Sequence, residues 1–85
     1  MPYQISISRE AAKTFRKVHP EAARRLKTAI LALADDPRPP GCIQLVGGAG
    51  ELRIRVGDYR VVYEIIDNEL VVLVLRVAHR REVYR

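Results

Sequence analysis

The sequence has little that would tie a small protein together covalently or hold it in a membrane. Among its 85 residues Cys42 is the only cysteine, which excludes an intramolecular disulfide. The longest apolar run, residues 70–75, is far shorter than the roughly 18 residues that a transmembrane helix needs. Charged residues appear as early as Arg9 and Glu10, unlike the start of a secretory signal peptide. These absences predict a cytoplasmic protein without a membrane partner.

Groups that hold metals or cofactors are equally sparse. His19, His79 and Cys42 are too few and too scattered for a metal site, and the only two serines lack the surroundings of a catalytic nucleophile. The segment 48–53 starts like a dinucleotide-binding fingerprint but leads into a predicted strand. We therefore expect neither metal nor cofactor. The chain is also too short for two lobes, so residues 1–85 are expected to form a single domain.

Positive charge is the clearest feature that is present. Fifteen Lys and Arg residues against ten Asp and Glu residues give a net charge of +5, which favours anionic partners such as nucleic acid. All three lysines lie in the first third of the chain, whereas the Lys and Arg positions from residue 53 onward are all arginine. Arginine presents a planar fork that suits phosphate. Codon bias toward arginine would give the same composition.

The first half of the chain predicts one strand and two helices. Apolar and polar residues alternate over 3–7, as in a strand with one buried face. Apolar residues then recur at helical spacing over 8–19 and 20–34, where Ser8 suits the cap of the first helix and Pro20 the start of the second. These two segments are a predicted helical hairpin.

The second half predicts a three-stranded meander. Prolines and glycines over 37–50 indicate a loop with at most a short extended piece at 43–46. Strands are expected over 52–56, 59–65 and 70–77, and the last should be central because both of its faces are apolar. The fold class is therefore α+β, in the order β-α-α-β-β-β. The helical hairpin should pack on a small, mainly antiparallel, twisted sheet.

The strands carry an unusual concentration of arginine. A two-residue turn at 57–58 would pair Arg55 with Arg60 and put Arg53 on the same face of the sheet. Like charges directly opposite each other destabilise a sheet by up to about 1 kcal/mol, so compensation is expected. Its source is open between an anionic ligand and two acids that share this face, Glu51 and Glu64.

Two further parts of the sequence bear on this face. Arg76 joins it only if the turn before the last strand includes Glu69, which makes that turn three residues long. The tail beyond the strand brings an imidazole, a phenol and more arginines near the 57–58 turn. Such a set suits phosphodiester cleavage in RNA, because arginines stabilise the charge on the phosphate while an acid and a base act on the 2′-OH and the leaving oxygen.

Two motifs at this site are shared with a known family. They are Gly57-Asp58-Tyr59-Arg60-x-x-Tyr63 and His79-Arg80-x-x-x-Tyr84, and together they resemble the RelE branch of the RelE/ParE toxin superfamily. The resemblance covers nearly the whole chain and implies a RelE-like toxin domain of a type II toxin-antitoxin system. Such a toxin cleaves mRNA in the ribosomal A site to a 2′,3′-cyclic phosphate. The implied partners are a cognate antitoxin, mRNA and the 16S rRNA of the ribosome, with operator DNA contacted only through the antitoxin complex.

The resemblance also implies a role for each residue. Arg53 and Arg55 match a substrate-contacting basic pair, Arg60 matches a phosphate-contacting arginine, and Tyr84 matches an aromatic residue that stacks on the base near the cut. We predict as catalytic residues Arg60, His79, Arg80 and Tyr84, and as substrate-binding residues Arg53, Arg55 and Arg81.

One departure from the family pattern bears on the mechanism. Relatives with lysine on the first strand of the meander have a candidate general base there, whereas Arg53 and Arg55 stay protonated. Acid-base work then falls to His79, with a nearby glutamate or a merely solvated histidine as alternatives. Two other functions stay open: a ParE-like DNA gyrase inhibitor and an RNA-binding homologue with weak or no activity. The intact tail of residues 79–84 favours the nuclease.

Overall fold

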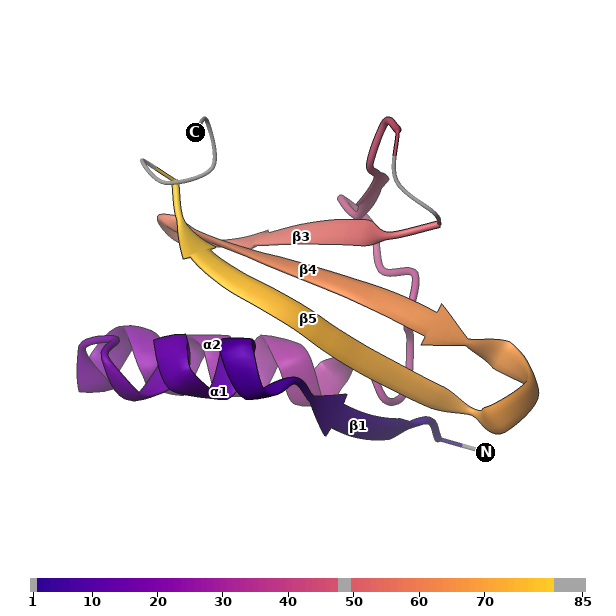
Figure 1. Cartoon of the computed structure of the whole chain (residues 1–85), viewed down its shortest axis with the longest axis horizontal. Helices are drawn as coiled ribbons and strands as arrows, with labels where there is room; N and C mark the ends of the chain where they lie inside the picture. The colour runs from indigo at the N-terminus through magenta and orange to yellow at the C-terminus, as the bar shows by residue number, and fades with distance from the viewer. Residues whose placement is uncertain (1, 48–49, 81–85) are drawn as a thin grey trace.

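The computed structural model describes residues 2–47 and 50–80. Within these residues two α-helices and five strands follow one another along the chain, and Figure 1 shows their arrangement. They are β1 (Gln4–Ile7), α1 (Arg9–Arg16), α2 (Pro20–Ala32), β2 (Ile43–Gln44), β3 (Leu52–Val56), β4 (Tyr59–Ile66), the short 3-10 helix η1 (Asp67–Glu69) and β5 (Val71–His79). The predicted order β-α-α-β-β-β is confirmed, and β2 is the short extended piece expected within the loop.

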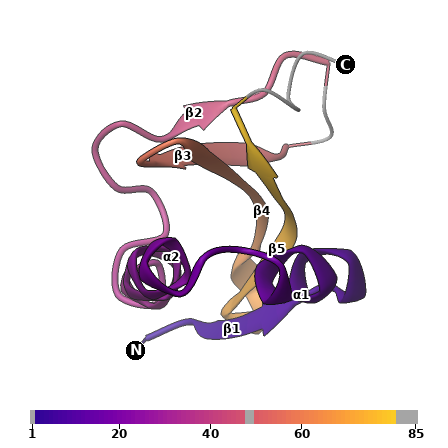
Figure 2. The ribbon, with the colours of Figure 1, turned by 90° about the vertical axis from the view of Figure 1, so that its left-hand side faces the viewer.

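The strands form one mixed sheet in the order β1-β5-β4-β3-β2. β1 runs parallel to β5, and the other neighbouring pairs are antiparallel. β5 therefore lies between β1 and β4, which confirms its predicted central position. Both helices cover the same face of the sheet, and Figure 2 shows them apart, with their connecting segment between them.

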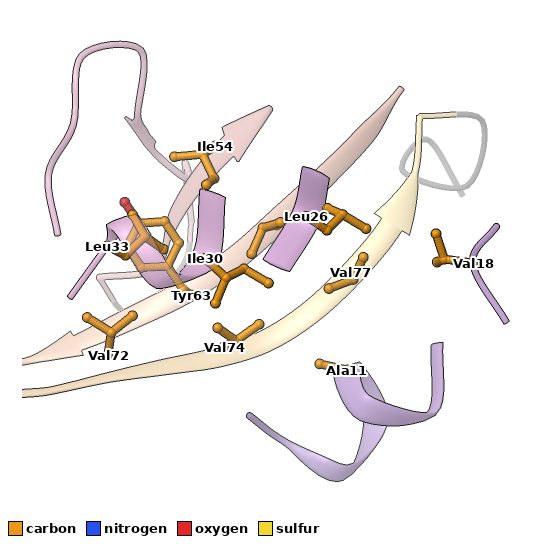
Figure 3. Packing of buried hydrophobic residues seen from close by; sticks show 11 residues of the cluster. Ala11, Val18, Leu26, Ile30, Leu33, Ile54, Tyr63, Val72, Val74 and Val77 are labelled. Atoms are coloured by element: carbon orange, nitrogen blue, oxygen red, sulfur yellow. The ribbon is translucent and has the colours of Figure 1, made fainter. Parts of the chain in front are cut away.

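The hydrophobic core fills the space between the helices and this face. Leu26, Ile30 and Leu33 from α2 and its C-terminal end pack with inward-facing residues of the strands, among them Val72 and Val74 (Figure 3). All five are almost fully buried. Alternate residues of β3, β4 and β5 supply the sheet's share of the core, so their neighbours in sequence must face the other side.

Both helices begin where the sequence predicts. The Ser8 hydroxyl accepts a hydrogen bond from the Ala11 N–H at 3.0 Å, and Pro20 occupies the first turn of α2. The end of α1 differs from the prediction, because the helix stops at Arg16 rather than near His19. His19 has extended backbone angles, since a residue before proline avoids the helical region, and its Nδ1 accepts the Glu21 N–H at 3.2 Å.

The connection between β4 and β5 corrects a second prediction. It has four residues rather than two or three, because η1 is followed by Leu70 in a left-handed conformation with φ of 54°. β5 consequently begins at Val71. Asp67 in this connection accepts hydrogen bonds from the Tyr3 hydroxyl at 2.6 Å and from Nη2 of Arg38 at 3.1 Å. These partners come from distant parts of the chain, which local sequence patterns do not reveal.

The loop after α2 is fastened to the core by one buried side chain. Tyr63 on β4 is fully buried, and its hydroxyl donates to the Pro37 carbonyl oxygen at 2.7 Å. Burial raises the pKa of Tyr63, so its hydroxyl keeps the proton that it donates.

Tyr63→Phe tests this contact. Loss of the hydroxyl leaves the Pro37 carbonyl without its donor and should cost about 1 kcal/mol of the free energy of unfolding. For a domain of this size, that corresponds to a decrease in Tm of about 4–8 °C, measured by circular dichroism. Tyr59→Phe is the matched control, because the Tyr59 hydroxyl bonds to no residue in the described ranges. Equal effects of the two substitutions would contradict the assignment.

Asp67→Asn tests the two hydrogen bonds that Asp67 in the β4–β5 connection accepts from Tyr3 and Arg38. The hydrogen bond from Tyr3 and then the Arg38 guanidinium lower the pKa of Asp67, so its charged form stabilises the fold above the ordinary aspartate pKa. That stability is lost as the pH falls through the lowered pKa. Wild type should therefore melt higher than the variant at neutral pH, and the two should converge in acid. A difference in Tm that did not depend on pH would contradict the stabilising role of the charged Asp67 side chain.

Candidate nucleic-acid interface

The turn between β3 and β4 determines how their arginines are arranged. It has two residues, Gly57 and Asp58, as predicted, and Gly57 has the left-handed φ of 60° that such turns require. Val56 consequently pairs with Tyr59, and Arg55 pairs with Arg60. The predicted register is confirmed.

Four arginines lie on the sheet face opposite the helices. One cross-strand row contains Arg55, Arg60 and Ala78, and the next contains Arg53, Val62 and Arg76. Their sequence neighbours on the strands, such as Ile54, Val61 and Val77, pack into the core. We term the set Arg53, Arg55, Arg60 and Arg76 the arginine face.

The arginine face brings positive charge close together and partly buries it. Arg60 at its centre is only 6% exposed and Arg53 is half-buried, whereas Arg55 and Arg76 are exposed. Burying charge costs free energy that a partner must offset. Over residues 2–47 and 50–80, neither Glu51 nor Glu64 forms an ion pair. These two acids therefore do not neutralise the face by direct contact.

Arg80 lies at the edge of this surface. Its backbone N–H donates to the Asp58 carbonyl oxygen at 2.7 Å, and its Nε is 4.0 Å from Oδ1 of Asp58. The end of β5 is thereby held beside the β3–β4 turn, as predicted. Arg80 follows Ala78 by two residues, so the chain leaves β5 next to the row that contains Arg55 and Arg60.

His79 is the last residue of β5 rather than part of a tail beyond the strand, and it does not lie on the arginine face. It pairs with Tyr59, and the two rings pack edge to face with centroids 5.3 Å apart. Tyr59 packs against the core, so His79 lies on the helix side of the sheet. The cause is the alternation along β5, which turns Ala78 outward and His79 inward. The remaining predicted site residues, Arg81 and Tyr84, lie outside the described residues.

Sequence patterns do not decide whether Arg76 belongs to the arginine face, and the structure places it there. Neither turn length considered above is the observed one, and the residue reaches the face because the β4–β5 register shifts between Val62 and Tyr63. A signal was present in the sequence. If the inward positions of Val72 and Val74 continued in steps of two, Arg76 would point into the core, so a charged residue there indicates an irregular strand.

Other kinds of site find no support in the part of the chain that the structure describes. No group of three or more His, Cys, Asp or Glu residues there could hold a metal ion. No helix there has the length and apolar character to cross a membrane.

Known proteins of similar sequence extend over the whole or nearly the whole length of this chain. The chain is 33% identical to toxin RelG of Mycobacterium tuberculosis, over the whole chain and 99% of that protein. It is 29% identical to the mRNA interferase toxin RelE of Escherichia coli, over 99% of the chain and 92% of that protein.

Solved structures share the fold. The archaeal RelE–RelB complex of Pyrococcus horikoshii matches with a TM-score of 0.82 and 27% identity, over 94% of this chain and 97% of that chain. A mutant of the E. coli toxin RelE in the free state matches with a TM-score of 0.82 and 27% identity, over 99% and 90%. Residues 5–84 also match the family model described as the ParE toxin of the type II toxin-antitoxin system parDE. The chain therefore belongs to the RelE/ParE family of type II toxins, in its RelE branch.

Proposed function

We propose that this toxin is a ribosome-dependent endoribonuclease that cleaves mRNA in the ribosomal A site. The observation that carries the proposal is the arginine face, with the nearly buried Arg60 at its centre and Arg80 at its edge. A cationic surface of this kind suits the backbone of a single RNA strand. The related E. coli RelE is named an mRNA interferase, which supports the same activity here.

The proposed reaction uses a nucleophile that RNA itself carries. The 2′-oxygen attacks the adjacent phosphorus, the bond to the 5′-oxygen of the next nucleotide breaks, and a 2′,3′-cyclic phosphate remains. Arg60 and Arg80 would stabilise the negative charge that develops on the phosphate oxygens, while Arg53, Arg55 and Arg81 would bind neighbouring parts of the strand. Because guanidinium groups supply this stabilisation, we propose a reaction that needs no metal ion.

Proton transfer must come from other groups, because arginine keeps its proton. Tyr84 is proposed to stack on the base at the cut or to donate a proton. Histidine is a common general acid or base, but the His79 ring would have to leave Tyr59 and move round the end of β5 to reach a phosphate on the arginine face. We therefore expect His79 to contribute less than Arg60.

The proposed partners follow from this activity. A cognate antitoxin is expected to hold the toxin inactive, and related toxins have been solved in complexes of RelE with RelB. The other proposed partners are mRNA and the 16S rRNA around the A site, with operator DNA reached only through the antitoxin complex. The proposed place of action is the cytoplasm, where ribosomes translate.

A second candidate function is inhibition of DNA gyrase, because the matching family model is described as a ParE toxin. In that case the arginine face would dock on a protein or on DNA, and no chemistry would occur there. An RNA-binding homologue with weak or no activity is the third possibility. Cleavage of translated mRNA separates the first function from the other two.

Arg60→Ala gives the central test of the nuclease. Purified protein is added to a translating extract, and new mRNA 5′ ends are mapped by primer extension, with ribosome-free mRNA as the control. Wild type should cut only translated message, and Arg60→Ala should slow cutting by a factor of about 100 or more, as for loss of one transition-state donor. Arg25→Ala on α2 removes the same charge from the other side of the sheet and should leave cleavage unchanged. If wild type cuts neither sample, a supercoiling assay then tests gyrase inhibition.

His79→Gln tests the acid-base assignment. Because its ring packs on Tyr59 on the helix side, we expect cleavage to slow by less than in Arg60→Ala. The rates of wild type and variant are measured between pH 5 and 8. If the variant lost as much activity as Arg60→Ala and also lost a pH dependence that wild type shows in this range, His79 would be the catalytic base after all.

A further inference from the structure

The β-bulge in β5 changes which way the second half of this strand faces. From the β4–β5 connection inward, Glu64 pairs with Leu73 and Tyr63 with Val74. The next pair is Val62 with Arg76, so Leu75 is an extra residue on β5. Without it, Arg76 would pair with Val61 and point into the core. The bulge thus moves a charged side chain from the buried face to the arginine face, a known use of bulges beside functional sites.

Ser8 holds this irregularity in place. Its hydroxyl donates to the Leu75 carbonyl oxygen at 2.8 Å while it accepts the Ala11 N–H at 3.0 Å. Its backbone N–H donates to the Val74 carbonyl oxygen at 2.9 Å. A hydroxyl can donate one hydrogen bond and accept two. The Ser8 side chain can therefore cap α1 and at the same time bind the carbonyl group of the bulged residue Leu75. The conformation that orients Arg76 is therefore a built feature of the fold.

The surroundings of Arg76 fit a ligand on the sheet surface. Arg76 is exposed, and no carboxylate in the described ranges forms an ion pair with it. Arg76 and Arg53 flank Val62 on its two sides, so one apolar side chain lies between these two arginines in the row. With strands about 4.8 Å apart, the two arginine backbones are separated by roughly 10 Å. That span covers about three nucleotides of a stacked strand.

We propose that Arg76 is a further RNA-binding residue, which contacts a backbone phosphate next to the one held by Arg60, and that Ser8 and the Leu75 bulge position it. This inference rests on the proposed function only in taking RNA as the anion. It assigns Arg76 to binding and Ser8 to positioning, and gives neither a part in the chemical step.

The test measures binding separately from cleavage. The probe is a single-stranded 2′-O-methyl RNA oligonucleotide, which lacks the nucleophile and cannot be cut, and binding is followed by fluorescence anisotropy over a range of KCl concentrations. Arg76→Ala should weaken binding at low salt about tenfold, as expected for one charge-assisted hydrogen bond. It should also reduce the slope of log affinity against log salt by about 0.7, the value for one phosphate contact on a single strand.

Two variants serve as controls. Arg76→Lys keeps the charge and should keep the salt slope, and Arg25→Ala removes an arginine from α2 and should leave binding as in wild type. Arg76→Ala behaving like Arg25→Ala would overturn the proposal, as would a wild-type protein that failed to bind the oligonucleotide at the lowest salt. Wild type that bound RNA through Arg76 but cut no translated mRNA would refute the nuclease and leave this inference standing.

A double-mutant comparison tests the positioning role. Ser8→Ala should weaken RNA binding in a protein that has Arg76 and should have no effect on binding in the Arg76→Ala background. Equal losses in both backgrounds would show that Ser8 acts through general stability and would overturn its part in the proposal. Circular dichroism confirms that each variant is folded at the temperature of the assay.

Discussion

The whole structure depends on the register that the Gly57–Asp58 turn imposes on β3 and β4. Side chains alternate between the two faces of a sheet, so a shift by one residue would exchange every buried residue for an outward one. In the observed register Val61 and Tyr63 are fully buried, and Arg60 faces the other side. The core and the arginine face are therefore two results of one pairing, and neither can change without the other.

The local parts of this fold could be predicted from the sequence. Ser8 and Pro20 begin the helices where expected, and the two-residue turn gives the pairing of Arg55 with Arg60. What could not be predicted depends on contacts between distant segments. The side of the sheet on which His79 lies follows from the β4–β5 register and the bulge, and that bulge is held by a hydroxyl 67 residues earlier in the chain.

The two faces of the sheet have opposite effects on the stability of this small domain. The helix side contributes the buried apolar area on which stability rests, while the other side carries four like charges in two adjacent rows. An anion that neutralised these charges would bind the folded state and not the unfolded chain, and would stabilise the fold by mass action. Ligand binding and thermal stability should accordingly be coupled in this toxin.

The parallel pairing of β1 with β5 has a consequence for how the protein folds during its synthesis. Residues 4–7 are synthesised well before their partners, residues 71–74. β1 therefore keeps an unpaired hydrogen-bonding edge until residues 71–74 have left the ribosome. The contact between Ser8 and the Leu75 bulge also forms only then. The sheet, and with it the orientation of Arg76 on the arginine face, is therefore completed only after β5 has been synthesised.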